Sequence, residues 1–157
     1  MYDVILASDH RGYQYKKACY DFLKSLEINH LNENDFSIGK ITELPAVNGT
    51  ERVDYPDIVK LVIDKFTENT RAILFCGSGF GVSMAANRSP LIRAGVARTC
   101  EDAKMMRLHN NANCLCIGTD FTTEFDTIQI IRTFFYTDFM GEHHIYRVNK
   151  LKTILNK

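Results

Sequence analysis

The chain has 157 residues, enough for one domain with a sizeable core, and 45% of them are hydrophobic. Its 19 Lys and Arg residues balance its 19 Asp and Glu residues, which argues against nucleic acid or a membrane surface as the main partner, because both select a basic excess. The five scattered cysteines favour free thiols over a disulfide framework, and the N-terminus lacks a signal-peptide pattern, so we expect a cytoplasmic protein.

The first part of the chain alternates short apolar runs with longer amphipathic ones. The run DVILAS at 3–8 is typical of a buried strand, and apolar residues at helical spacing predict a helix over 13–26. A second strand is expected at 27–31. Residues 32–54 are polar and have no clear period, which indicates a long loop. Pro56 is typical of the first turn of a helix, and that helix is expected to follow the loop.

The same alternation continues to the end of the chain. Apolar runs predict three more strands, at 71–76, 93–97 and 112–118. Helical spacing predicts helices over 80–88, 101–109, 123–136 and 143–156. Repeated alternation of strand and helix predicts an α/β fold in one domain, 1–157, with a parallel sheet covered by helices on both faces.

Polar motifs follow three of the predicted strands. Ser8-Asp9-His10 follows the first strand, Cys76 opens a glycine-rich loop after the third, and Gly118-Thr119-Asp120 ends the fifth. In open α/β sheets, ligands bind at the carboxyl ends of the strands. We therefore expect these motifs to form a site.

The glycine-rich loop FCGSGFGVSMAAN at 75–87 is the most distinctive segment. Its G-x-G-x-G spacing differs from the G-x-G-x-x-G of dinucleotide sites, and it lacks the Lys-Ser/Thr ending of a P-loop. Glycines after a strand let backbone N–H groups approach an anion closely. The loop is either a site that stabilises an oxyanion or cradles a small substrate, or a tight structural turn.

Several side chains near these motifs could carry chemistry, and each also has a structural interpretation. Cys76 could act as a thiolate beside the start of a helix, or be a buried small side chain. Asp9 and His10 could bind a sugar hydroxyl or act as acid and base, or Asp9 could cap the next helix. His109 suits a helix C-terminus through the helix dipole. The pair His143-His144 has no partner at metal-ligand spacing, so no metal site is expected.

Six stretches, spread in order over nearly the whole chain, match one known family. They are Ser8-Asp9-His10-Arg11-Gly12, Asp54-Tyr55-Pro56-Asp57, CGSGFGVSMAAN at 76–87, Ile92-Arg93-Ala94, Arg107 through Asn113, and Gly141 through Val148. In this combination the chain resembles the type B ribose-5-phosphate isomerases and the related galactose-6-phosphate isomerase subunits. The resemblance implies a three-layer Rossmann-like domain with a five-stranded parallel sheet. It also implies a homodimer or a dimer of dimers with shared active sites, and a C-terminal tail helix, within 139–157, that packs on a partner subunit.

The resemblance assigns roles to individual residues. Cys76 matches the base that moves a proton between C1 and C2 of the sugar, and Ser78 matches a hydroxyl that stabilises the enediolate oxygen. Asp9 and His109 match sugar-binding and ring-opening residues, His109 coming from the partner chain. The residues expected to bind substrate are His10, Gly77, Gly79, Gly81, Ser83, Asn110 (from the partner chain), His144 and Arg147.

The implied reaction is the interconversion of ribose 5-phosphate and ribulose 5-phosphate through an enediolate, a step of the pentose phosphate pathway. It requires no cofactor and no metal, because a base, an oxyanion site, an acid for the ring oxygen and cations for the phosphate suffice. Two alternatives stay open. One is the isomerisation of a six-carbon sugar phosphate, and the other is a non-catalytic homologue that binds a sugar phosphate.

Two positions depart from the family's pattern at the phosphate end. The family usually has arginine where this chain has Asp120 and His143. Histidine lacks the permanently charged guanidinium fork, and Asp120 would repel a phosphate if it pointed inward. Arg11 or Arg98 could supply the missing cation, and we include Arg11 among the substrate-binding residues. The loop 32–54 is also longer than this family is expected to have.

Overall fold

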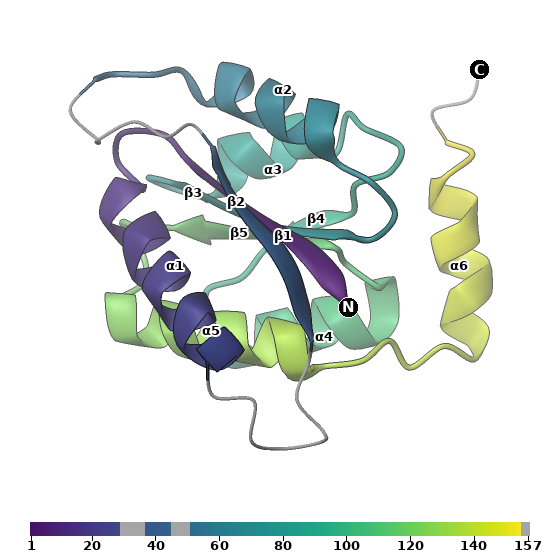
Figure 1. The fold of residues 1–157 in the computed structure, drawn as a ribbon. Coiled ribbons are helices and arrows are strands. Elements are labelled where there is room, and N and C mark those ends of the chain that lie inside the picture. Colours follow the sequence, from purple (N-terminus) through teal and green to yellow (C-terminus); the bar gives the residue numbers. More distant parts are fainter. Residues whose placement is uncertain (29–36, 45–50, 155–157) are drawn as a thin grey trace.

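A five-stranded parallel sheet forms the middle layer of the domain (Figure 1). The computed structural model describes residues 1–28, 37–44 and 51–154. The strands are β1 (Tyr2–Ser8), β2 (Ile38–Leu44), β3 (Thr70–Cys76), β4 (Ala94–Val96) and β5 (Cys114–Gly118). Their order in the sheet is β2-β1-β3-β5-β4, and every neighbouring pair is parallel. All carboxyl ends therefore lie along one edge of the sheet.

Helices cover both faces of the sheet. They are α1 (Tyr13–Ile28), α2 (Tyr55–Lys65), α3 (Phe80–Ala86), α4 (Cys100–Asn110), α5 (Glu124–Tyr136) and α6 (His143–Leu151). Helices α2 and α3 pack together on one face, and α1, α5 and α4 form the layer on the other (Figure 1). Helix α6 stands at the side of these layers and contacts α4. The predicted α/β fold with three layers is confirmed.

The central strands are buried on both faces, which explains their continuous apolar sequences. Along β1, Val4 and Leu6 face the core beneath α1 and α5, while Ile5 and Ala7 face the core beneath α2. The same division holds along β3 and β5. Because successive side chains of a strand point to opposite faces, a strand between two helical layers is apolar over most of its length.

The second strand lies later in the chain than the sequence predicted. Glu27 and Ile28 are the last residues of α1, and 29–31 lie outside the described residues. Strand β2 occupies 38–44, inside the range expected to be a loop; 32–36 and 45–50 are not described. As an edge strand, β2 is only partly buried, so it carries polar residues and shows no apolar run.

The C-terminal helix is shorter than predicted. It begins at His143 as expected but ends at Leu151, and 155–157 lie outside the described residues. The N–H of Lys152 donates to the carbonyl of Asn149, and that of Thr153 to the carbonyl of Lys150, so the last turn tightens and the helix stops. Across the described part of the chain, no helix is long and apolar enough to cross a membrane.

Candidate active site

The polar motifs that follow β1, β3 and β5 meet at the carboxyl edge of the sheet. The backbone N–H of Asp9 donates to the carbonyl of Phe75 at 3.2 Å. On the other side of β3, the N–H of Thr119 donates to the carbonyl of Cys76 at 2.9 Å. These bonds hold the turn after β1 and the turn after β5 against the glycine loop, as the sequence predicted.

The glycine loop surrounds the sulfur of Cys76. This side chain is 5% exposed, and its Sγ accepts the backbone N–H of Gly79 at 3.1 Å. Gly79 has φ 78°, a left-handed conformation that favours glycine, and α3 begins at the next residue. A Cβ on Gly118 would lie 2.5 Å from the carbonyl oxygen of Ser78. The loop is thus a tight turn that places a backbone N–H donor at the thiol, and its role as an oxyanion or substrate site stays a prediction.

Asp9 and His10 occupy the turn that leads into α1. Oδ1 of Asp9 accepts the backbone N–H groups of Arg11 at 2.9 Å and Gly12 at 3.1 Å, so this carboxylate does hold the start of the helix. Gly12 allows a close approach, because a Cβ there would lie 2.5 Å from the Cβ of Phe75. The buried Nδ1 of His10 has no hydrogen-bond partner within the described part of the chain. The predicted contact of His10 with the substrate stays a prediction.

Arg11 crosses the glycine loop and pairs with Asp120. Its Nη2 lies 2.6 Å from Oδ1 of Asp120, and both side chains are about half exposed. Its guanidinium rests against Gly77, where a Cβ would lie 2.5 Å from Cζ of Arg11. Asp120 therefore faces a cation in this structure. Arg98 lies elsewhere at the same edge, with its guanidinium 4.4 Å from the ring centroid of Phe121.

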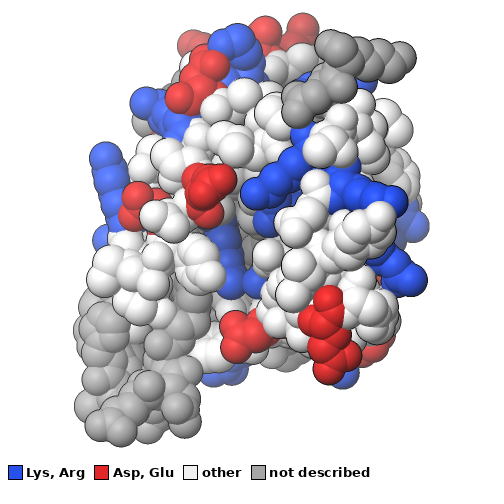
Figure 2. All heavy atoms as spheres, turned by 90° about the vertical axis from the view of Figure 1, so that its right-hand side faces the viewer, with Lys and Arg blue, Asp and Glu red and all other residues white. Residues whose placement is uncertain are grey.

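The other predicted site residues form a second group, between the end of α4 and α6. His109, Asn110, His144 and Arg147 line a cavity of about 320 Å³. The rings of His109 and His144 are stacked, with centroids 4.4 Å apart. Burial, followed by the nearby His143, His109 and Arg147, lowers the pKa of His144, since each disfavours a further positive charge. Figure 2 shows the side of the molecule that carries α6, where Lys and Arg side chains gather near the middle.

The two groups lie at opposite ends of the sheet. The Cys76 group stands at the carboxyl edge, whereas His109 lies in the last turn of α4, the helix that leads into the amino end of β5. β5 alone, from Cys114 to Gly118, spans about 13 Å at ~3.3 Å per residue. In Figure 1, α6 lies on the side where β1 begins, away from the strands' carboxyl ends. One chain therefore does not bring Cys76 and His109 together, and a partner's supply of His109 and Asn110 stays a prediction.

One predicted residue lies beside a second thiol, and one neighbour of the loop escaped the sequence analysis. The hydroxyl of Ser83 faces the buried thiol of Cys116 beneath α3, and its predicted contact with the substrate stays a prediction. Tyr55, at the start of α2, packs on the loop, and a Cβ on Gly81 would lie 2.8 Å from its ring. The Asp-Tyr-Pro match was the available signal for Tyr55. Within 1–28, 37–44 and 51–154, no group of three or more His, Cys, Asp or Glu side chains is arranged to hold a metal ion.

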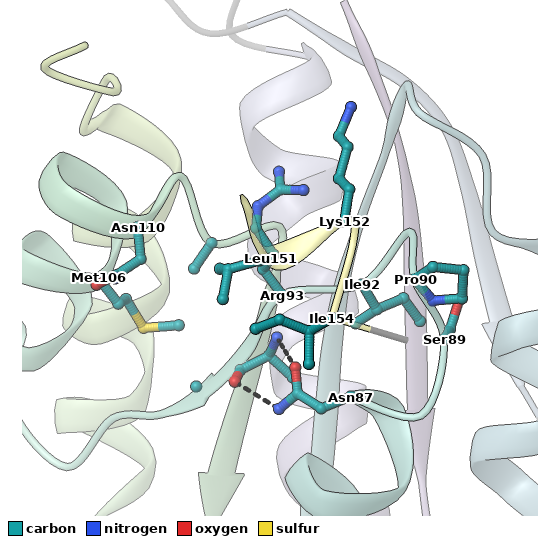
Figure 3. A pocket seen from close by; sticks show the side chains of 13 residues that line it. Asn87, Ser89, Pro90, Ile92, Arg93, Met106, Asn110, Leu151, Lys152 and Ile154 are labelled. Carbon is teal, nitrogen blue, oxygen red and sulfur yellow. Dashed lines mark hydrogen bonds between the residues drawn. The ribbon is translucent and has the colours of Figure 1, made fainter. Parts of the chain in front are cut away.

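A larger and more apolar groove lies beside the histidine cavity (Figure 3). It holds about 390 Å³ between α4, the segment around β4 and the C-terminal segment. Its apolar lining includes Ile92, Met106, Leu151 and Ile154. Asn87 fixes one wall, because its side-chain amide exchanges two hydrogen bonds of 2.9 Å with the backbone of Ala94. The groove lies far from Cys76 and shares Asn110 and Leu151 with the histidine cavity.

Comparisons with known proteins agree with the motifs. The family model described as Ribose/Galactose Isomerase matches residues 4–151. A Rickettsia conorii protein described as a sugar phosphate isomerase is 36% identical over 153 residues, which are 96% of this chain and 98% of that protein. A Mycoplasma genitalium protein named "Probable ribose-5-phosphate isomerase B" is 34% identical over 155 residues, 96% of this chain and 93% of that one.

A solved structure gives the same result. The crystal structure of ribose-5-phosphate isomerase B from Mycoplasma genitalium with bound ribulose-5-phosphate superposes with a TM-score of 0.84 at 31% identity, covering 96% of this chain and 94% of that one. The match thus extends over the sheet, the glycine loop and α6. The chain therefore belongs to the ribose/galactose isomerase family, the family of the type B ribose-5-phosphate isomerases, and it is an isomerase.

Proposed function

We propose that this chain interconverts ribose 5-phosphate and ribulose 5-phosphate through an enediolate, with Cys76 as the base. The observation that carries the proposal is the sulfur of Cys76, held in the glycine loop with the N–H of Gly79 donating to it at 3.1 Å. A donor at the sulfur stabilises a thiolate more than a thiol, since bonds to an ionised acceptor are stronger. The bound ribulose-5-phosphate in the Mycoplasma genitalium structure supports the choice of a five-carbon substrate.

The glycine loop supplies both the base and the donors for the enediolate oxygen, which the reaction needs close together. Cys76 takes the proton from C2 of the open-chain aldose, the electron pair moves to O1, and an enediolate forms. The proton returns at C1 while the hydroxyl proton at O2 passes to O1, which gives the ketose. We expect backbone N–H groups between Gly77 and Gly81, with the hydroxyl of Ser78, to stabilise the enediolate oxygen. Two of them, those of Gly79 and Phe80, donate to Sγ of Cys76 and Oγ of Ser78 in this structure. The loss of one such donor typically lowers the rate by about 10²–10³.

The second group of residues completes the site from another copy of the chain. His109 would act as acid and base on the ring oxygen, Asn110 would bind the sugar, and His144 and Arg147 would face the phosphate. Because these residues lie at the far end of the sheet from Cys76, a second copy must supply them. Exposed apolar residues of α6, Ile145 at 50% and Tyr146 at 66%, suit a surface that a second copy covers.

The direct test is turnover by the purified protein in the presence of a metal chelator. We expect interconversion of ribose 5-phosphate and ribulose 5-phosphate, and loss of turnover in Cys76→Ala with an unchanged circular dichroism spectrum. Cys76→Ser is the matched control, since it keeps the size of the side chain but removes the acidic thiol. Full activity in Cys76→Ala would refute the assignment of the base.

A six-carbon sugar phosphate is the second candidate substrate, because the matching family model covers galactose as well as ribose isomerases. Turnover of a panel of four-, five- and six-carbon aldose phosphates distinguishes these two candidate substrates, and we expect the highest kcat/KM on ribose 5-phosphate. Tight binding without turnover on every member of the panel would instead indicate a non-catalytic homologue.

A further inference from the structure

The ion pair between Arg11 and Asp120 bridges two turns that flank the glycine loop. Arg11 lies in the turn after β1 and Asp120 in the turn after β5, on opposite sides of β3. Nη2 of Arg11 lies 2.6 Å from Oδ1 of Asp120. The pair therefore spans the mouth of the loop that holds Cys76.

Hydrogen bonds fix the backbone of both residues of this ion pair. The N–H of Asp120 donates to the carbonyl of Gly77 at 3.0 Å, and the N–H of Arg11 donates to Oδ1 of Asp9 at 2.9 Å. The Arg11 side chain is 52% exposed and has several rotatable bonds, so its bonds to Asp120 limit its position. An exposed ion pair adds little stability by itself, but bonds from an anchored carboxylate restrict where the guanidinium can lie.

The arrangement leaves donors of the guanidinium beside the loop. Nη2 is bonded to Asp120, whereas Nη1 and Nε lie beside Gly77, which has no side chain. The permanently charged N–H groups of an arginine form strong, charge-assisted hydrogen bonds with phosphate oxygens. Arg98 is differently placed, since it packs on the rings of Phe121 at 4.4 Å and Phe80 at 5.2 Å.

We infer that Asp120 is a positioning residue that holds Arg11 across Gly77, so that Arg11 meets the phosphate of the substrate. This inference rests on the proposed function, because it takes a sugar phosphate as the ligand. The carboxylate of Asp120 stays at Nη2, so the N–H donors of Nη1 and Nε remain for the phosphate. Asp120 thus acts through Arg11 and makes no contact with the substrate itself.

The test compares Arg11→Met, Asp120→Asn and the double variant in the full-length protein. Arg11→Met keeps the apolar stem, and we expect it to raise KM for ribose 5-phosphate and Ki for inorganic phosphate about tenfold, with kcat within about threefold. Asp120→Asn should raise both constants about threefold or more by releasing the guanidinium, and Asp120→Glu should restore most of the loss. In the Arg11→Met background, Asp120→Asn should have no further effect.

The control is Arg98→Met, which should leave Ki for inorganic phosphate unchanged. Unaltered constants in Arg11→Met would overturn the inference, and so would tighter phosphate binding in Asp120→Asn, because Asp120 would then repel the ligand. Calorimetric binding of inorganic phosphate gives the same comparison without turnover. If the wild-type protein binds phosphate but does not convert ribose 5-phosphate, the proposed function fails while the Arg11–Asp120 pair is still tested.

Discussion

At the scale of single residues, the thiols of this chain differ in their surroundings. Burial, with a smaller contribution from Glu43, raises the pKa of Cys19, and burial with the neighbouring Cys114 raises that of Cys116, so both thiols stay protonated and inert. The sulfur of Cys76 has a backbone N–H donor instead. A sequence shows five cysteines, but only the fold shows which of them has a donor at its sulfur.

This difference predicts the pattern of alkylation. In a Cys100→Ser variant, which removes the exposed thiol, we expect iodoacetamide to modify Cys76 and to spare Cys19 and Cys116, because the raised pKa of each of these two thiols suppresses its reactive thiolate. Peptide mass spectrometry locates the modified residue, and turnover should fall in parallel with modification of Cys76. Labelling of Cys19 or Cys116 before Cys76 would contradict the assignment.

Gly118 is a second residue with a structural requirement, because the backbone of Ser78 leaves no room for a side chain there. A Cβ at this position would lie 2.5 Å from a backbone oxygen of Ser78, and backbone cannot move aside without shifting the glycine loop. We expect Gly118→Ala to lower the free energy of unfolding in urea by about 1–3 kcal/mol and to reduce kcat.

The matched control for Gly118 lies in the neighbouring strand. A Cβ on Gly95 would lie 2.8 Å from Cε of Met106, the far end of a flexible side chain that can rotate away. Gly95→Ala should therefore lower the free energy of unfolding by less than about 1 kcal/mol. Equal effects of the two substitutions would show that close approach to backbone is not what requires Gly118.

At the scale of elements, burial decides what the sequence reveals. Strands β1, β3 and β5 are covered on both faces, and their apolar runs predicted them with small errors in their bounds. Edge strand β2 is only partly buried, so its polar sequence concealed it within an expected loop. The apolar run at 27–31 misled because a short run does not separate a strand from the last turn of a helix.

The seam between α4 and α6 gives an element-scale prediction about pH. The folded-state pKa of His144 is lowered by burial and by the neighbouring His143, His109 and Arg147, whereas the carboxylate of Glu142 acts in the opposite sense. Folding therefore favours neutral His144, so its contribution to stability is present above the unfolded pKa of about 6.5 and is lost as pH falls through the folded value. Urea unfolding at pH 7.5 and 5.5 measures this loss.

We expect the loss of stability on acidification to be smaller in His144→Asn than in the wild-type protein, because asparagine does not titrate. His143→Asn is the comparison variant, since it removes a neighbouring imidazole 4.0 Å from His144 and keeps His144 itself. It should leave part of the pH dependence in place. An identical pH dependence in the wild-type protein and in His144→Asn would contradict the assigned cause.

At the scale of the whole molecule, the sequence motifs selected candidate site residues but did not show how far apart they lie. Asp9, Cys76 and His109 were selected from motifs, yet the topology places His109 at the opposite end of the sheet from the other two. The contact between Arg11 and Asp120, 109 residues apart, was also beyond the sequence, because neither position carries a local signal for the other. Motifs reveal residue types, whereas the distances between them follow from strand order.

This separation leads to a prediction about mixed oligomers. If two copies share each site, Cys76→Ala and His109→Asn are both inactive alone, but they damage different halves of the site. A dimer with one chain of each kind contains one doubly damaged site and one intact site. Random exchange makes half of the dimers mixed, so the mixture should recover about a quarter of the wild-type activity.

The experiment unfolds the two variants together in urea, refolds them and measures turnover, with each variant refolded alone as the baseline. A second mixture, of Cys76→Ala with Ser78→Ala, is the control, because both substitutions lie in the same half of the site and no mixed dimer contains an intact one. Recovery in the first mixture only would establish that Cys76 and His109 act from different chains. Failure to recover activity, with mixed dimers demonstrated by native mass spectrometry, would mean that each chain completes its own site, and the last turn of α4, which carries His109, would then have to move to the carboxyl edge of the sheet.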